Sequence, residues 1–110
     1  MILDKDGNIT IITQEQKSIP VLIDKITSSY NKFQNDNIVI NLTVWSEVTI
    51  SDILEFLQIS NQHRKKKLSF VIVTDKANLN EMPDEIIVVP TMHEAYDIIE
   101  MEEMERDLDF

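Results

Sequence analysis

The fold is decided by residues 38–74, which read IVINLTVWSEVTISDILEFLQISNQHRKKKLSFVIVT. The two ends of this stretch, 38–42 and 68–73, are nearly continuous runs of β-branched and other apolar residues, a pattern typical of strands covered on both faces. Between them, apolar residues recur at helical spacing and predict a helix that begins near Ser51. These residues are Ile50, Ile53, Leu54 and Leu57. A strand, a helix and a strand over this length form a right-handed crossover, so we expect the two strands to be parallel neighbours.

The residues before this unit predict a hairpin and a helix. Asp6-Gly7 lies between residues 2–5 and 8–12, which are expected to form two strands, and readily supplies the positive φ angles of a two-residue turn. Ser18 is then placed to cap a helix whose first turn contains Pro20. An apolar stripe on this helix is expected to face the core. Its members are Ile19, Leu22, Ile23, Ile26, Tyr30 and Phe33.

The residues after the central unit predict a loop, a strand and a final helix. Residues 75–85 show no sustained period and are expected to form a loop with at most one helical turn. Residues 86–89 predict a short buried strand, and Thr91 with Glu94 forms a capping box for the last helix. We therefore expect one α/β domain with a mixed sheet, helices packed on it, central parallel strands and the order ββαβαβα.

The central unit resembles the middle of a STAS domain, the module of bacterial anti-sigma factor antagonists. The run Pro90-Thr91-Met92-His93-Glu94-Ala95 is also similar to the start of the last helix in that family. The resemblance covers residues 8–100 and implies a regulatory protein that binds other proteins. In STAS domains an Asp-Ser-Ser-Gly signature precedes the central helix, and a partner kinase phosphorylates its second serine. Here the signature falls on residues 49–52 and only Ser51 matches it.

Composition and charge narrow the classes of function. The chain has 110 residues, no cysteine and a net charge of -10. Such a charge repels phosphate backbones and anionic lipids, so we expect neither nucleic-acid nor membrane binding. No apolar run is long enough to cross a bilayer and no signal peptide is recognisable, which together with the lack of cysteine favours the cytoplasm. Gly7 is the only glycine, which argues against a glycine-rich phosphate loop.

The last helix is predicted to have two apolar stripes. Met92, Ala95 and Ile99 are expected to face the sheet, whereas a second stripe is displaced around the axis. That second stripe consists of Ile98, Met101, Met104 and Leu108. It outlasts the expected domain of residues 1–100, so we treat 101–110 as an acidic carboxyl-terminal helical extension. The stripe is expected either to dock on another chain, including a second copy, or to belong to a frayed tail that folds back.

The acids are concentrated in the same helix. Residues 94–109 contain eight acids and one base, Arg106. The acids are Glu94, Asp97, Glu100, Glu102, Glu103, Glu105, Asp107 and Asp109. They favour a basic protein partner over an acidic one, although a charged face that only keeps the protein in solution is the alternative.

The start of the central helix, together with the last helix, is the surface that we expect to bind a partner. The candidate residues at the central helix are Trp45, Glu47, Thr49, Asp52 and Glu55, and those on the last helix are Met101, Met104 and Leu108. Trp45 either anchors a partner or covers the sheet edge. Ser51 is a possible phosphorylation site, because a phosphate in the first turn of a helix is stabilised by the helix dipole. The alternative is that Ser51 or Thr49 caps the helix, with Asp52 complementing its dipole.

The two histidines do not indicate a metal site. His63 and His93 are isolated and belong to no pair or cluster of the kind that binds zinc. The run from His63 to Lys67 ends the central helix, where cations complement the dipole, or it forms a small basic patch for an acidic partner. We therefore predict no catalytic residue, no metal and no cofactor.

Taken from sequence, the expected function is that of a non-catalytic, STAS-like regulatory module that binds a protein partner and possesses a degenerate phosphorylation signature. Two alternatives stay open: a switch protein that accepts a phosphoryl group at Ser51, and a structural subunit, such as a homodimer, that assembles through its carboxyl-terminal helix.

Overall fold

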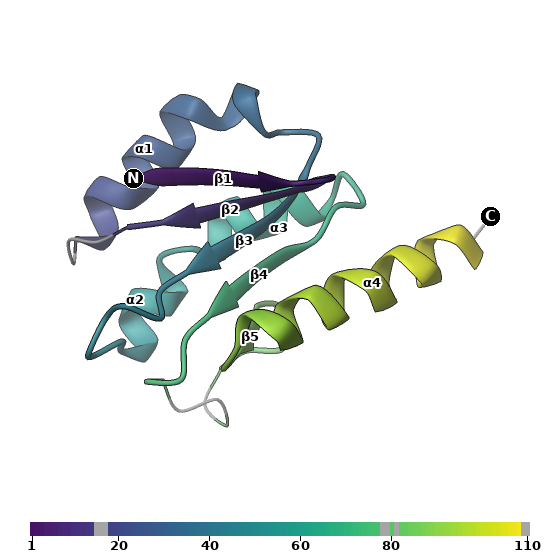
Figure 1. The fold of residues 1–110 in the computed structure, drawn as a ribbon. Helices are drawn as coiled ribbons and strands as arrows, with labels where there is room; N and C mark the ends of the chain where they lie inside the picture. The colour runs from purple at the N-terminus through teal and green to yellow at the C-terminus, as the bar shows by residue number, and fades with distance from the viewer. Residues whose placement is uncertain (15–17, 78–79, 81, 109–110) are drawn as a thin grey trace.

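The computed structural model of the chain describes residues 1–14, 18–77, 80 and 82–108. In that part of the chain, one five-stranded sheet has the order β1-β2-β3-β4-β5 (Figure 1). The strands are β1 Ile2–Asp6, β2 Ile9–Thr13, β3 Asn37–Asn41, β4 Phe70–Val73 and β5 Ile87–Val89. The helices are α1 Ile19–Ser29, α2 Ile50–Leu54, α3 Leu57–Arg64 and α4 Met92–Leu108, and a short 3-10 helix, Tyr30–Lys32, follows α1.

The sheet is mixed, as predicted. β1 is antiparallel to β2, whereas β2, β3, β4 and β5 are parallel to their neighbours. The expected parallel pairing of the two central strands is confirmed, with Ile38 opposite Phe70 and Ile40 opposite Ile72. The predicted order ββαβαβα is one strand short, because both β4 and β5 precede α4, and the expected single central helix is divided into α2 and α3.

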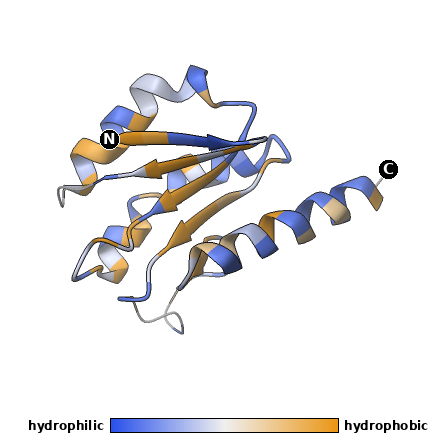
Figure 2. Cartoon of the chain, viewed as in Figure 1, coloured by the Kyte–Doolittle hydropathy of each residue, from blue (hydrophilic) through white to orange (hydrophobic). Residues whose placement is uncertain are grey.

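The helices cover the two faces of the sheet unequally. Since the parallel strands follow one another across the sheet, right-handed crossovers place α1, α2 and α3 on one face. α4 lies alone on the opposite face and extends beyond the strands towards the C-terminus (Figure 1). Hydrophobic residues dominate the strands, whereas α4 is mostly hydrophilic with separate hydrophobic patches (Figure 2). The molecule therefore has three layers: helices, sheet and a single helix.

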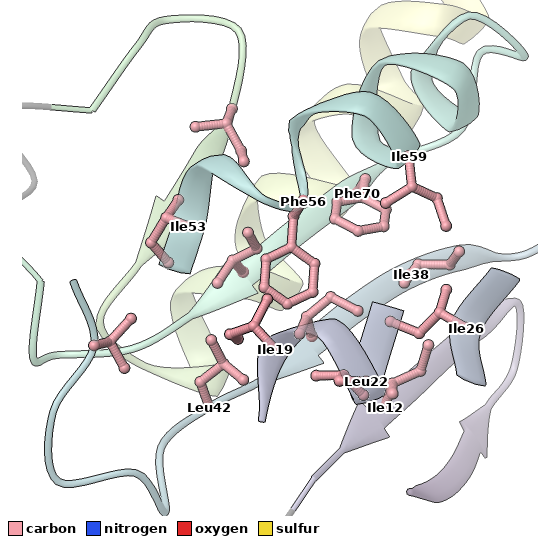
Figure 3. Packing of buried hydrophobic residues seen from close by; sticks show 14 of the residues in the cluster. Ile12, Ile19, Leu22, Ile26, Ile38, Leu42, Ile53, Phe56, Ile59 and Phe70 are labelled. Atoms are coloured by element: carbon pink, nitrogen blue, oxygen red, sulfur yellow. The ribbon is translucent and has the colours of Figure 1, made fainter. Parts of the chain in front are cut away.

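The alternation of side chains along β3 and β4 divides the core into two clusters. Ile38 and Ile40 pack with Phe70 against the α1–α3 layer, and Val39 packs with Val71 against α4. In the larger cluster Ile12, Leu22, Ile26, Ile53, Phe56 and Ile59 join them (Figure 3). Full burial of each of these side chains stabilises the fold by roughly 1.5 to 3 kcal/mol before entropy is counted.

The hairpin forms one residue later than predicted. Asp6 pairs with Ile9, so the turn residues are Gly7 and Asn8 and not Asp6 and Gly7. Gly7 has a φ of 60°, and glycine at the first central position is typical of a type II′ hairpin. The glycine thus serves the turn, as the sequence predicted.

The first helix matches its predicted stripe but not its predicted cap. Ile19, Leu22 and Ile26 are buried, and Pro20 lies in the first turn. The Ser18 side chain makes no capping hydrogen bond, although its carbonyl accepts one from the Leu22 N–H at 3.0 Å. The capping role expected for Ser18 is therefore wrong.

The central helix is broken where a single helix was expected. α2 ends at Leu54, and the Phe56 N–H donates to the Ile53 carbonyl at 3.0 Å, a tighter turn than an α-helix makes. Ile53 and Phe56 are buried and Leu54 is exposed, which corrects the expectation that Leu54 belongs to the inward stripe.

The described residues between β4 and β5 pack on the same face of the sheet as α1, α2 and α3. Residues 78, 79 and 81 lie outside the described residues, so the predicted loop at 75–85 is only partly described. On both sides of them, Ala77, Met82 and Ile86 pack against the larger core cluster. Within the described part of the chain, no helix is long and apolar enough to cross a membrane.

Candidate functional site

The last helix begins near the predicted position. The Glu94 N–H donates to the Thr91 hydroxyl at 3.1 Å, which is one of the two hydrogen bonds of the expected capping box. In the first half of α4, Ala95 and Ile99 are buried, and Met92 packs against the same cluster. The first stripe therefore faces the sheet.

In the second half of α4, the side facing the sheet is polar. The Ser69 hydroxyl donates to the Glu102 carboxylate at 2.6 Å and accepts from the Arg106 guanidinium at 3.1 Å. Arg106 also donates to the Asn37 side-chain oxygen at 3.4 Å, and Arg64 of α3 lies 3.7 Å from Glu102. Asn37 and Ser69 stand at the starts of β3 and β4. These contacts attach the helix to the amino-terminal edge of the parallel strands.

Two further contacts connect α4 to the hairpin. The Asn8 side-chain amide donates to the Glu103 carboxylate at 3.0 Å. The Tyr96 side chain lies close to the Asp6 carboxylate. Partial burial, followed by the nearby negative charge of Asp6, raises the pKa of Tyr96 above its usual value of 10.0. The hydroxyl therefore remains a neutral hydrogen-bond donor at physiological pH.

The side of α4 that faces away from the sheet shows the reverse pattern. Met101, Met104 and Leu108 are 56%, 60% and 77% exposed, and we call these three residues the α4 stripe. Residues at spacings of three, four and seven lie on one side of a helix. The apolar side of α4 thus changes from inward to outward after Ile99, because polar residues take the inward positions.

Acidic residues accompany the α4 stripe. Glu105 and Asp107 are exposed next to it, and Glu100 is exposed one turn earlier. Arg106, the only base in residues 94–108, points to the sheet. The exposed part of this helix is therefore apolar with an acidic border, and we call the stripe with this border the α4 surface.

The predicted boundary at residue 100 lies inside α4. The helix continues unbroken from Met92 to Leu108, and the polar contacts of Glu102, Glu103 and Arg106 attach residues beyond 100 to the domain. Up to Leu108 the extension is a helix that packs back onto the domain, so the expected contact with the domain is present but these residues are not frayed.

The start of α2 is capped by two of the predicted site residues. The Asp52 N–H donates to the Thr49 hydroxyl at 3.1 Å, and the Thr49 N–H donates to the Asp52 carboxylate at 3.0 Å. These two bonds form a capping box. Ser51 is exposed between them. Capping therefore belongs to Thr49 and Asp52, and phosphorylation of Ser51 stays a prediction.

Of the two roles expected for Trp45, partner anchor or cover of the sheet edge, the structure shows a buried, structural side chain. It is 3% exposed, and its indole N–H donates to the Gln14 carbonyl at 2.7 Å. The ring packs in the larger core cluster and is not part of the surface. Glu47 and Glu55, by contrast, are exposed.

The two predicted partner-binding regions lie at opposite ends of the sheet. α2 follows the carboxyl end of β3, whereas the second half of α4 contacts residues at the amino ends of β3 and β4. The two regions also belong to different faces of the sheet (Figure 1). They are therefore two separate surfaces.

The inward polar residues of α4 were not found from sequence. Glu102, Glu103 and Arg106 were treated as part of one acidic field, whereas each has a specific partner on the domain. The signal that could have found them is the displacement of the apolar stripe, because an outward stripe requires that polar residues occupy the inward positions.

Comparisons with known proteins add no family. No protein-family model matches the chain, and a search of curated proteins finds no match. The described residues also contain no group of three or more histidines, cysteines or acids that could bind a metal ion. The resemblance to STAS domains stays a prediction from the sequence.

Proposed function

We propose that this protein is a non-catalytic regulatory module that binds a protein partner through the α4 surface. The observation on which the proposal depends is the reversal of polarity along α4. Its second half is attached to the sheet by hydrogen bonds, while Met101, Met104 and Leu108 face solvent. Exposed apolar residues aligned along a helix and bordered by charge are typical of helix-in-groove recognition.

The chemistry of the partner follows from the acids around the stripe. Glu100, Glu105 and Asp107 border it, and the whole chain has a net charge of -10. A groove that is apolar at its floor and lined by lysine or arginine complements this surface. Methionine adapts its shape to such a groove because its side chain is unbranched.

Charge also favours a different protein over a second copy of this chain. Two copies of α4 packed side by side would bring together two helices that each contain seven acids and one base between residues 94 and 108. Like charges at such short range repel each other. The basic end of α3 does not relieve this repulsion fully, because Arg64 already pairs with Glu102 of its own chain. The homodimer is therefore the second candidate.

The STAS-like part of the proposal concerns the role of binding. The support for it is the α/β fold with parallel central strands and an exposed turn before α2, on which Glu47, Thr49 and Ser51 lie at the surface. In such a module binding itself regulates the partner. A phosphoryl switch at Ser51 would add control to the same role, and stoichiometric phosphate on Ser51 in protein from growing cells is the observation that would establish it.

Co-purification with matched variants tests the proposal. The chain is isolated from native cells as wild type, as the triple variant Met101→Ser, Met104→Ser, Leu108→Ser, and as a control variant Val21→Ser, Val44→Ser, Leu54→Ser. The control removes three exposed apolar side chains from other elements. We expect one protein to be retained by the wild type and the control and lost by the α4 variant.

Folding of the α4 variant must be checked in parallel. Its three substituted side chains face solvent, so the free energy of unfolding should change by no more than about 0.5 kcal/mol for each. Retention of the same partner by a folded α4 variant would refute the proposed surface. Light scattering of the purified wild-type chain and of the α4 variant tests the homodimer. A wild-type dimer that becomes a monomer in the α4 variant would favour a second copy as the partner.

A further inference from the structure

A cleft lies between the carboxyl-terminal half of α1 and α3, on the opposite face of the sheet from α4. Its volume is about 370 Å³, and Ile23, Tyr30 and Ile59 contribute apolar surface to its lining. Glu55, Gln58 and Gln62 add polar groups. This volume lies in the range of small-molecule sites, which combine an apolar lining with a few polar groups.

The buried histidine behind the cleft determines what the Tyr30 hydroxyl can do. His63 Nε2 lies 2.7 Å from the Asp36 carbonyl, which only accepts hydrogen bonds, so this nitrogen is protonated. His63 Nδ1 lies 2.5 Å from the Tyr30 hydroxyl. Burial lowers the pKa of His63 below 6.5, so the ring is neutral and Nδ1 is an acceptor. Tyr30 therefore donates its only hydroxyl proton to His63.

Tyr30 and Glu55 consequently offer a ligand only acceptors, whereas Thr27, Gln58 and Gln62 can either donate or accept. The Tyr30 oxygen has only lone pairs left to offer, and the Glu55 carboxylate accepts hydrogen bonds and is negatively charged. The aliphatic side chains of Ile23 and Ile59 offer contact to a hydrocarbon chain. A group that only donates, and that is positively charged, fits this set best.

We propose that the cleft between α1 and α3 binds a small aliphatic amine, with its ammonium group held by Glu55 and the Tyr30 oxygen and its hydrocarbon chain against Ile23 and Ile59. This site is independent of the α4 surface. One cation opposes the preference: the Lys66 ammonium lies 5.0 Å from the centre of the Tyr30 ring. Its removal should therefore strengthen the binding of an amine, and this gives the proposal a test with two opposite signs.

The test is a titration of the ¹⁵N-labelled full chain with hexylamine, hexan-1-ol and hexanoate, followed by NMR. The three probes have the same hydrocarbon chain and differ in the polar group. We expect hexylamine to shift the amide signals of residues 23, 30, 55 and 59 saturably. Its affinity should exceed that of hexan-1-ol by about threefold to fivefold, the range of an exposed charge pair, and hexanoate should bind most weakly.

Variants locate the ammonium group. Glu55→Gln should weaken hexylamine binding by about threefold to fivefold, whereas Lys66→Gln should strengthen it by about twofold. Glu47→Gln removes the same charge outside the cleft and should change the affinity by less than about twofold. Equal or tighter binding of hexan-1-ol or hexanoate, no saturable shift with hexylamine, or equal effects of the two glutamate substitutions would each overturn the proposal.

Discussion

At the scale of single residues, His63 shows how far a local pattern can mislead. It stands in the run from His63 to Lys67, which reads as an exposed basic end of a helix, yet its side chain is 0% exposed. Its two ring nitrogens contact Tyr30 and the Asp36 carbonyl, 33 and 27 residues away along the chain. Partners so distant cannot be inferred from neighbours in the sequence, so the role of His63 could not be predicted.

The burial of His63 predicts a pH dependence of stability. Because its pKa is lowered in the folded chain, the unfolded chain binds a proton more readily. The contribution of neutral His63 to the free energy of unfolding is complete above pH 6.5. It is lost as the pH falls from 6.5 through the lowered pKa of His63 in the folded chain. The difference in free energy of unfolding between pH 7.5 and 5.5, measured with denaturant, should therefore be smaller in His63→Gln than in the wild type.

His93 offers a matched control for this measurement. It is exposed on α4, so His93→Gln controls for the replacement of a histidine that is not buried. All other titrating groups are shared by the three proteins, and their effects cancel in the comparison. If His63→Gln kept the wild-type dependence, the buried neutral histidine would be refuted.

Other residue roles were readable because they depend on short spacings. The Thr49 and Asp52 capping box and the Thr91 cap involve residues three positions apart, and both form. Trp45 was left with two roles, because its partner, the Gln14 carbonyl, is 31 residues away. Sequence therefore predicts contacts between residues a few positions apart better than contacts between residues distant along the chain.

At the scale of elements, the strands were predictable and the break in the central helix was not. β3 and β4 are nearly uniform apolar runs, and burial on both faces follows directly from that pattern. The break between α2 and α3 contains neither glycine nor proline. The buried residues Ile53, Phe56 and Ser60 also have the spacing of one continuous helical face, so neither composition nor period signals the break.

The end of α3 predicts a stabilising substitution. Lys67 has a φ of 62°, the left-handed conformation that favours glycine after a helix. Lys67→Gly should raise the free energy of unfolding by about 0.5 to 1 kcal/mol, because it removes the steric cost of a side chain there. Chemical denaturation measures this difference.

Lys65→Gly is the control for that substitution. This substitution removes the same charge two residues earlier, but the φ of Lys65, -62°, is helical. Glycine there should lower the free energy of unfolding by about 0.5 to 1 kcal/mol. If both substitutions stabilised the protein, removal of a positive charge would be the cause. If Lys67→Gly destabilised it, the proposed backbone strain at Lys67 would be contradicted.

At the scale of the whole molecule, the two faces of the sheet differ in the helices that cover them. One face of the sheet is closed by three helices over the larger core cluster, and the other by α4 alone. The first stripe of α4 was predicted because it follows a simple period. The inward polar contacts of its second half could not be, since their partners Asn8, Asn37 and Ser69 come from three separate strand starts. These contacts orient the α4 stripe outward.

Site-specific photo-cross-linking in growing cells tests the α4 surface most directly. A photoreactive amino acid is placed at position 104 or, as a control, at position 44, where Met104 and Val44 are 60% and 61% exposed. We predict one cross-linked protein at position 104, abolished by Met101→Ser with Leu108→Ser, and none at position 44. The same cross-linked protein at position 44, or none at 104 while a partner still co-purifies, would contradict binding through α4.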